Sequence, residues 1–168
     1  MAGPLIVTAE FAPDDYAWLE GLRRAHYPFD QNRVPVHLTM FQGLPPSAVD
    51  EVRHQLAIHS AAPPPRASLA GLMNLSSGVA YRVVSDDLEA IRESIADHFH
   101  GLLCAPDAVG WRPHITIQNK VAAREAKALL DELERDFRPR PLAVSGLLLH
   151  RYRGGPWETL ATYRFRGA

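Results

Sequence analysis

The sequence predicts an α+β fold in which one order of strand, helix and hairpin occurs twice. Apolar residues alternate with polar ones over short runs, as in half-buried strands, and recur every three or four positions in longer runs, as in helices. Proline and glycine residues mark the turns between these runs. Because the order repeats over residues 5–84 and 86–166 without a long polar linker, we expect one domain over residues 1–168. The two halves should share a core, each contributing a small antiparallel sheet.

The individual elements follow from the same patterns. Strands are expected at residues 5–11, 33–41, 67–75, 79–84, 142–150 and 157–165, and around 114–117. Helices are expected to begin at Pro13, near Ser47 and at Asp86, and another should include residues 126–137. Ser47 stands at the head of a segment that fits the capping-box form, so we expect it to cap its helix.

Two copies of one short pattern, His-x-Thr between apolar residues, stand 77 positions apart, at His37 to Met40 and at His114 to Ile117. Eight histidines and five threonines predict only roughly 0.24 such matches by chance, so the pair indicates a functional pattern. The alternative is a chance pair on two unrelated surface strands. Side chains alternate between the faces of a strand. Each His and its Thr should therefore share a face, and we expect His37, Thr39, His114 and Thr116 to line one cleft.

These residue types suit acid-base chemistry on a phosphodiester. Cleavage needs a base for the attacking oxygen and an acid for the departing one, and imidazole can serve as either because its ordinary pKa is about 6.5. A threonine hydroxyl can donate a hydrogen bond to a non-bridging phosphate oxygen, where charge grows in the transition state. Such chemistry needs no metal ion or cofactor. The sequence does not decide which histidine is the base and which the acid.

The paired motifs, their spacing and the repeated unit resemble the two-histidine (2H) phosphoesterase superfamily, in particular its 2′-5′ RNA ligase-like and cyclic phosphodiesterase members. The resemblance runs from Leu5 to Phe165 and is most specific in the segment from Trp111 to Lys120. It implies a two-lobed, pseudo-symmetric fold with antiparallel sheets flanking a central cleft and helices packed outside. It also implies metal-independent action on 2′,3′-cyclic or 2′,5′-linked phosphodiesters of nucleotides or RNA ends. Ligation is the same chemistry in reverse, so its direction stays open.

Further candidate substrate contacts lie close to the motifs or at a hairpin turn. Arg112 shares a strand face with the second motif, and Phe41 shares one with the first, where an aromatic ring could stack on a base. Lys120 follows the second motif strand, and Tyr152 and Trp157 stand on either side of the second hairpin turn. The alternatives are solvated charges for the arginine and the lysine and packing roles for the aromatic residues.

The amino-acid composition of the chain limits the kinds of molecule that the protein is expected to bind. A formal net charge of −1 excludes a strongly basic surface for long nucleic acids, so we expect a nucleotide cyclic phosphate or a short RNA end as partner. The single Cys104 fits a reducing compartment and no apolar run approaches the length of a membrane span, so we expect a cytoplasmic monomer. A metal hydrolase is a weaker alternative, because neither motif histidine has a carboxylate or cysteine at ligand spacing. The remaining alternative is a non-catalytic module that binds a nucleotide or an RNA end.

Overall fold

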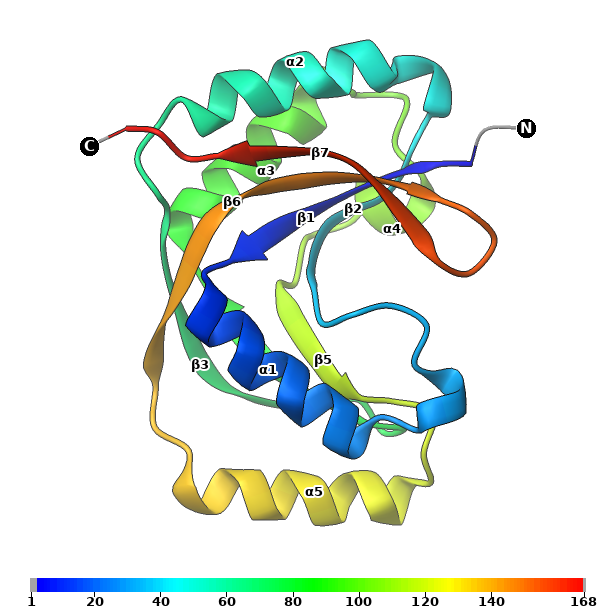
Figure 1. Ribbon diagram of the computed structural model, residues 1–168, viewed down its shortest axis with the longest axis vertical. Coiled ribbons are helices and arrows are strands. Elements are labelled where there is room, and N and C mark those ends of the chain that lie inside the picture. The colour runs from blue at the N-terminus through cyan, green and yellow to red at the C-terminus, as the bar shows by residue number, and fades with distance from the viewer. Residues whose placement is uncertain (1–2, 168) are drawn as a thin grey trace.

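The computed structural model describes residues 3–167 and confirms the α+β class. Within these residues seven strands form one antiparallel arrangement with the helices outside it (Figure 1). The strands are β1 (Leu5–Phe11), β2 (Leu38–Leu44), β3 (Arg66–Asn74), β4 (Val79–Val84), β5 (His114–Gln118), β6 (Arg140–Tyr152) and β7 (Trp157–Arg164). The helices are α1 (Pro13–His26), α2 (Val49–Ser60), α3 (Asp86–His98), α4 (Ala105–Ala108) and α5 (Ala123–Asp136), with 3₁₀ turns at Phe29–Gln31 and Pro46–Ala48. None of the described helices is both long and apolar enough to cross a bilayer.

One long strand, β6, joins two lobes of the sheet. Its residues 140–143 pair with β3, and its residues 144–151 pair with β1. The strand order is β2-β1-β6-β3-β4-β5, and β7 also pairs with β6. One lobe therefore contains β2, β1, β6 and β7, and the other contains β6, β3, β4 and β5. The two motif strands, β2 and β5, stand at opposite ends of the strand order.

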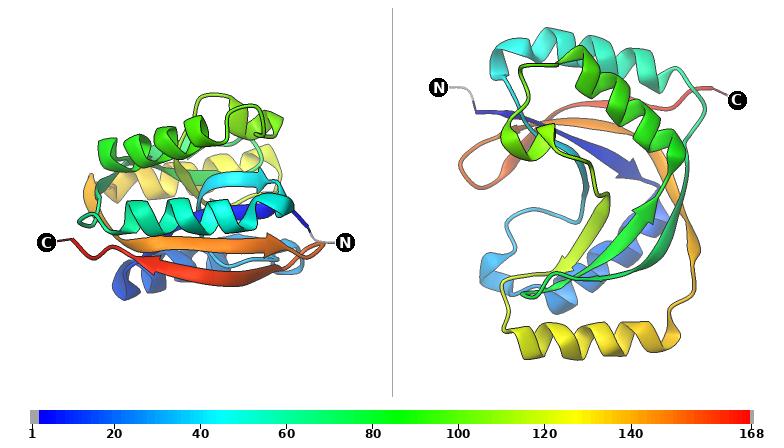
Figure 2. Two further views of the ribbon diagram at one scale, coloured as in Figure 1. Left: turned by 90° about the horizontal axis from the view of Figure 1, so that it is seen from above. Right: turned by 180° about the vertical axis from the view of Figure 1, so that it is seen from behind.

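Each lobe takes strands from both halves of the chain. β2 shares its lobe with the late β6–β7 hairpin, and β5 shares its lobe with the early β3–β4 hairpin. The prediction that each half forms its own sheet is therefore wrong. The reason is that the connection through α2 leads from β2 in one lobe to β3 in the other, and that β6 itself runs from its pairing with β3 to its pairing with β1. α2 packs on β6 and β7, whereas α5 packs on β3 and β4 at the opposite end of the molecule (Figure 2).

The first motif strand begins later than predicted. Strands β1 and β4 have the predicted ends, but β2 starts at residue 38 instead of 33. Pro35 has no N–H for a strand ladder, and the N–H of Val36 donates to Glu20 Oε1 at 3.1 Å. His37 consequently lies on the extended segment just before the strand.

The start of α2 also differs from the prediction. Residues 46–48 form a 3₁₀ turn, and α2 begins at Val49 without a side-chain cap, so the capping role assigned to Ser47 is wrong. A side-chain cap is found on α3, where Ser85 Oγ accepts a hydrogen bond from the N–H of Leu88 at 3.1 Å. The proline next to Ser47 fixes its own φ and favours a tight turn there.

Aliphatic side chains of the motifs anchor the site to the core. Leu38, Met40, Ile115 and Ile117 are all at most 1% exposed. The histidine and threonine side chains between them are only partly buried, as strand alternation predicts. Burial of each aliphatic side chain contributes roughly 1.5–3 kcal/mol, so the core holds both motif backbones firmly in place.

Candidate active site

The four motif side chains line one cleft. His37, Thr39, His114 and Thr116 border the same cavity, whose volume is about 510 Å³. The motif strands stand at opposite ends of the strand order, but the sheet curves so strongly that β2 and β5 contact each other. Curvature of the sheet therefore builds the cleft from two segments that are far apart in the chain.

The two imidazoles are held in the same way. His37 Nδ1 donates a hydrogen bond to the main-chain oxygen of Pro35 at 2.9 Å, and His114 Nδ1 donates to that of Arg112 at 2.7 Å. A carbonyl oxygen can only accept, so each ring keeps a proton on Nδ1. In both motifs Nε2 is therefore the nitrogen that can accept or deliver a proton.

Burial lowers the pKa of His37 from 6.5 to about 4. Desolvation is the largest cause, because it penalises the charged imidazolium. The hydrogen bond to Pro35 opposes this change, and the positive charge of Arg23 adds to it. His37 is consequently neutral near pH 7, with Nε2 ready to accept a proton.

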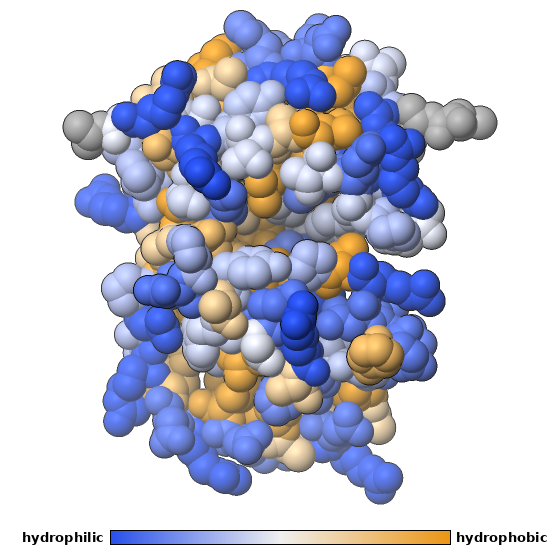
Figure 3. All heavy atoms as spheres, viewed as in Figure 1, coloured by the Kyte–Doolittle hydropathy of each residue, from blue (hydrophilic) through white to orange (hydrophobic). Residues whose placement is uncertain are grey.

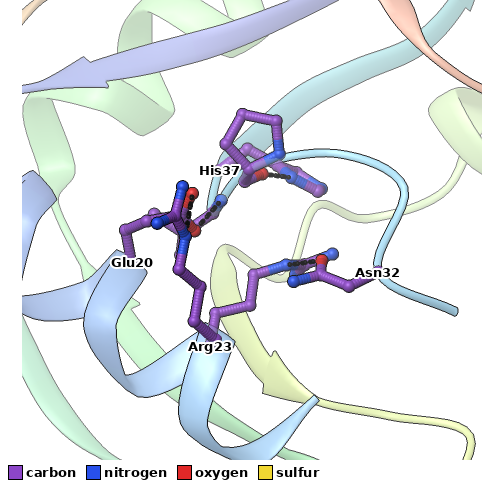
Figure 4. A network of polar contacts seen from close by, with 7 residues as sticks. Glu20, Arg23, Asn32 and His37 are labelled. Carbon is purple, nitrogen blue, oxygen red and sulfur yellow. Dashed lines mark hydrogen bonds and ion pairs between the residues drawn. The ribbon is translucent and has the colours of Figure 1, made fainter. Parts of the chain in front are cut away.

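Helix α1 contacts both motifs through two side chains one turn apart. Glu20 accepts a hydrogen bond from the N–H of Val36, and Val36 directly precedes the first motif. Arg23 donates from Nε to Asn32 Oδ1 at 2.9 Å and from Nη1 to the main-chain oxygen of Thr116 at 2.8 Å. Figure 4 shows Glu20 and Arg23 on neighbouring turns, with Arg23 reaching towards Asn32 below His37. One helix thus fixes the first motif segment relative to the second.

Arg23 is a residue of the site that the motif pattern does not predict. Its side chain is only 3% exposed. A sequence signal exists, since Arg23 stands four residues after buried Leu19 on the same face of α1. An arginine at such a position must have hydrogen-bond partners inside the protein.

Two tryptophans complete the wall around the first motif. Trp111 Nε1 donates to the main-chain oxygen of Thr39 at 2.9 Å, which ties the segment before β5 to β2. The Trp157 ring lies between two imidazoles, with centroids 4.7 Å from His37 and 5.3 Å from His150. Trp157 thereby contributes to the burial that keeps His37 neutral.

Each motif strand has a β-bulge directly after its threonine. The pairing of β2 with β1 skips Met40, which follows Thr39. The pairing of β5 with β4 skips Ile117, which follows Thr116. An extra residue reverses the alternation of side chains beyond it. Phe41 and Gln118, each two positions after a motif threonine, therefore do not share the face of the motif.

This reversal corrects the prediction for Phe41. Its ring is 0% exposed and packs in the core, with the guanidinium carbon of Arg92 4.4 Å from the ring centroid, so it cannot stack on a base. Gln118, after the second bulge, is also buried, and its Oε1 has no hydrogen-bond partner among the described residues. Lys120 is exposed beyond the end of β5 and does not line the cleft. Of the predicted substrate contacts, Arg112, Tyr152 and Trp157 border the cleft.

A buried pair that sequence analysis does not identify supports the other end of the cleft. Arg92 donates from Nε to the main-chain oxygen of Met40 at 3.0 Å and from Nη2 to that of Asp107 at 2.8 Å. The Asp107 carboxylate accepts hydrogen bonds from the N–H groups of Gln42 and Gly43 at 2.9–3.0 Å. Both side chains border the cleft while holding the bulged strand β2 against α3 and α4. Within residues 3–167, no three His, Cys, Asp or Glu side chains gather closely enough to hold a metal ion.

Comparison with known proteins identifies the family. Residues 11–156 match the model of the 2′-5′ RNA ligase superfamily. The chain belongs to this superfamily. The sequence resemblance to the 2H phosphoesterases is thereby confirmed, and membership supports a phosphoesterase-type activity.

Several solved structures share the fold of this chain. TT0787 of Thermus thermophilus is 18% identical, with a TM-score of 0.66 and 98% of each chain covered. E. coli LigT, crystallised with 3′-AMP, is 15% identical, with a TM-score of 0.59 and 98% of this chain and 99% of LigT covered. A further structure described as a phosphoesterase is 17% identical, with a TM-score of 0.55 and 97% and 98% covered. No curated protein matches the sequence.

Proposed function

We propose that the protein is a metal-independent phosphoesterase that acts on 2′,3′-cyclic or 2′,5′-linked phosphodiesters of nucleotides or RNA ends. The observation that carries this proposal is the matched pair of histidines in one cleft. Each has its Nδ1 held by a main-chain carbonyl and its Nε2 left for proton transfer. E. coli LigT has been crystallised with 3′-AMP, ATP and NADP⁺, which supports a nucleotide ligand.

The proposal assigns the base to His37 and the acid to His114. His37 is neutral near pH 7 because burial lowers its pKa to about 4. In hydrolysis of a cyclic phosphate, Nε2 of His37 takes a proton from water while the water oxygen bonds to phosphorus. The bond from phosphorus to one ribose oxygen breaks, and protonated His114 supplies the proton which that oxygen needs.

The threonines and three other cleft residues have supporting roles in this scheme. The hydroxyls of Thr39 and Thr116 donate to the non-bridging phosphate oxygens, which gain charge in the transition state. Arg112 supplies a cation at the cleft, and Tyr152 and Trp157 offer aromatic surface to a base or sugar. The single cysteine, Cys104, fits action in the reducing cytoplasm.

A substrate panel with matched variants tests the proposal. Purified protein is incubated in excess EDTA with 2′,3′-cyclic nucleotides, 2′,5′-linked dinucleosides and RNA that ends in a cyclic phosphate. We expect turnover of at least one substrate, unchanged by EDTA and lost in His37→Ala and in His114→Ala. Loss of activity in EDTA with recovery on adding zinc or manganese would contradict the proposal. Tight binding of these compounds without turnover would instead favour a non-catalytic binding module.

A further inference from the structure

A second cavity, of about 420 Å³, adjoins the catalytic cleft. His37 and Trp157 border both spaces, so these two rings form the shared rim. Tyr16 of α1, Val36 and Leu148 add to its other walls. Its volume lies in the range typical of small-molecule sites, and Figure 3 shows a furrow across the middle of this face of the molecule.

Several polar side chains that line this second cavity already have hydrogen-bond partners. His150 uses both ring nitrogens, Nε2 with Thr8 Oγ1 at 2.9 Å and Nδ1 with Thr159 Oγ1 at 3.0 Å. Glu10 Oε1 contacts Ser145 Oγ at 3.2 Å as well as an arginine of β7. The walls therefore offer apolar and aromatic surface with few free hydrogen-bonding groups.

The charge of the lining selects against a phosphate. Among the described residues no lysine or arginine borders this cavity, whereas the carboxylate of Glu10 does. An anion would thus lack a cation partner and lie near a negative charge. An uncharged planar group fits better, because aromatic side chains stack on any nucleobase without reading its edges.

We propose that the second cavity binds the uncharged nucleoside on the His37 side of the phosphate. This inference rests on the proposed function and names its substrate as a diester that joins two nucleosides. A cyclic mononucleotide has a single nucleoside and leaves the second cavity empty. When a 2′,5′-linked diester is cleaved, the 3′ oxygen of the nucleoside in the second cavity bonds to phosphorus and gives its proton to Nε2 of His37. The bond from phosphorus to the 5′ oxygen breaks, and protonated His114 gives that oxygen the proton with which the other nucleoside leaves.

The test compares two substrates in one enzyme. We measure kcat/KM for a 2′,3′-cyclic mononucleotide and for the matching 2′,5′-linked dinucleoside monophosphate, in wild type and in Tyr16→Ala. Tyr16 is 39% exposed, so its loss should not disturb folding. Loss of one stacking contact should lower the ratio of dinucleoside to cyclic kcat/KM roughly tenfold. Phe29→Ala removes an exposed aromatic ring that borders neither cavity and should leave this ratio unchanged.

A second variant, Leu148→Trp, fills the cavity instead of opening it. It should raise KM for the dinucleoside and lower the same ratio, with folding checked by the melting temperature. An unchanged ratio in both variants, or wild type that cleaves the cyclic substrate alone, would overturn this inference while leaving the proposed function intact. Failure of wild type to turn over either substrate would overturn the proposed function itself.

Discussion

Arg23 donates a hydrogen bond to the main-chain oxygen of Thr116 over a distance of 2.8 Å, although 93 positions separate the two residues in the sequence. Glu20 of the same helix accepts a hydrogen bond from the N–H of Val36, the residue directly before the first motif. The spacing of the two motifs therefore depends on α1 as well as on the curvature of the sheet. Arg23 also lies close enough to His37 for its charge to lower the pKa of that imidazole.

Replacing Arg23 should impair stability and catalysis together. Arg23→Ala leaves the oxygens of Asn32 and Thr116 without their donor, so we expect the free energy of unfolding to fall by about 2–4 kcal/mol. Arg23→Lys should recover part of the lost free energy of unfolding, because it keeps a positively charged donor. The neighbouring Arg24→Ala is the control, because the Arg24 side chain is 77% exposed and should cost less than about 0.5 kcal/mol. Urea denaturation measures all three, and equal losses in Arg23→Ala and Arg24→Ala would show that α1 does not hold the motifs in this way.

Removal of either motif histidine should abolish most turnover. We expect His37→Ala and His114→Ala to lower kcat by about two to four orders of magnitude with a much smaller change in KM. Thr39→Ala and Thr116→Ala should cost less, since each removes one hydroxyl donor. His98→Ala is the matched control, because His98 lies on α3 and contacts Glu51 far from the cleft. Wild-type kcat in His37→Ala would refute its role as base.

The acid limb of the pH profile should lie far below the ordinary range of histidine. The pKa of His37 is lowered to about 4, so kcat/KM should fall only as the pH drops towards 4. Arg23→Ala removes a nearby positive charge and should move this limb to higher pH. The alkaline limb reports the acid of the pair, and both values are macroscopic. A profile with its acid limb near pH 6.5 would contradict the assignment of His37 as the base with a lowered pKa.

As the pH falls through a defined window, protonation of His150 should lower the free energy of unfolding. Burial lowers its pKa to about 4, whereas the unfolded chain has the ordinary value near 6.5. The unfolded state therefore binds the proton first, so this stabilisation is complete above about pH 6.5 and is lost as the pH falls towards 4. We expect a loss of up to about 3 kcal/mol from this residue. His37 adds to the loss in the same window.

Urea denaturation at pH 7 and pH 4.5 isolates the part due to His150. The difference between the two pH values should be smaller in His150→Gln than in wild type. His98→Gln, at an exposed position, should keep the whole difference. An equal pH dependence in wild type and His150→Gln would show that the buried imidazole is not responsible.

The sequence predicts those features that depend on local pattern. Alternation of apolar and polar residues predicts the ends of β1 and β4 and the shared cleft of the two motifs. It fails at Phe41, because one bulged residue in β2 reverses the faces that alternation assigns. A bulge is set by pairing with a neighbouring strand, which a single strand sequence does not contain.

Features that depend on distant contacts are also beyond local pattern. Arg23 is a site residue because its partners, Asn32 and the main chain of Thr116, come from two other segments. The exchange of hairpins between lobes depends on the connection after α2 and on the two successive pairings of β6. Tertiary packing decides these features, because the apolar pattern of each element is the same whichever lobe it enters.

The central position of β6 has a consequence for how the protein is made. Leu5 of β1 pairs with Arg151 of β6, near opposite ends of the chain. During synthesis the first strand and the first motif leave the ribosome long before their partner exists, so the lobe that holds them closes last. Contacts between such distant residues form slowly because their loop must close first. A chain halted after α5 would lack the shared strand of both lobes as well as Trp157, so such a fragment would not contain a finished cleft.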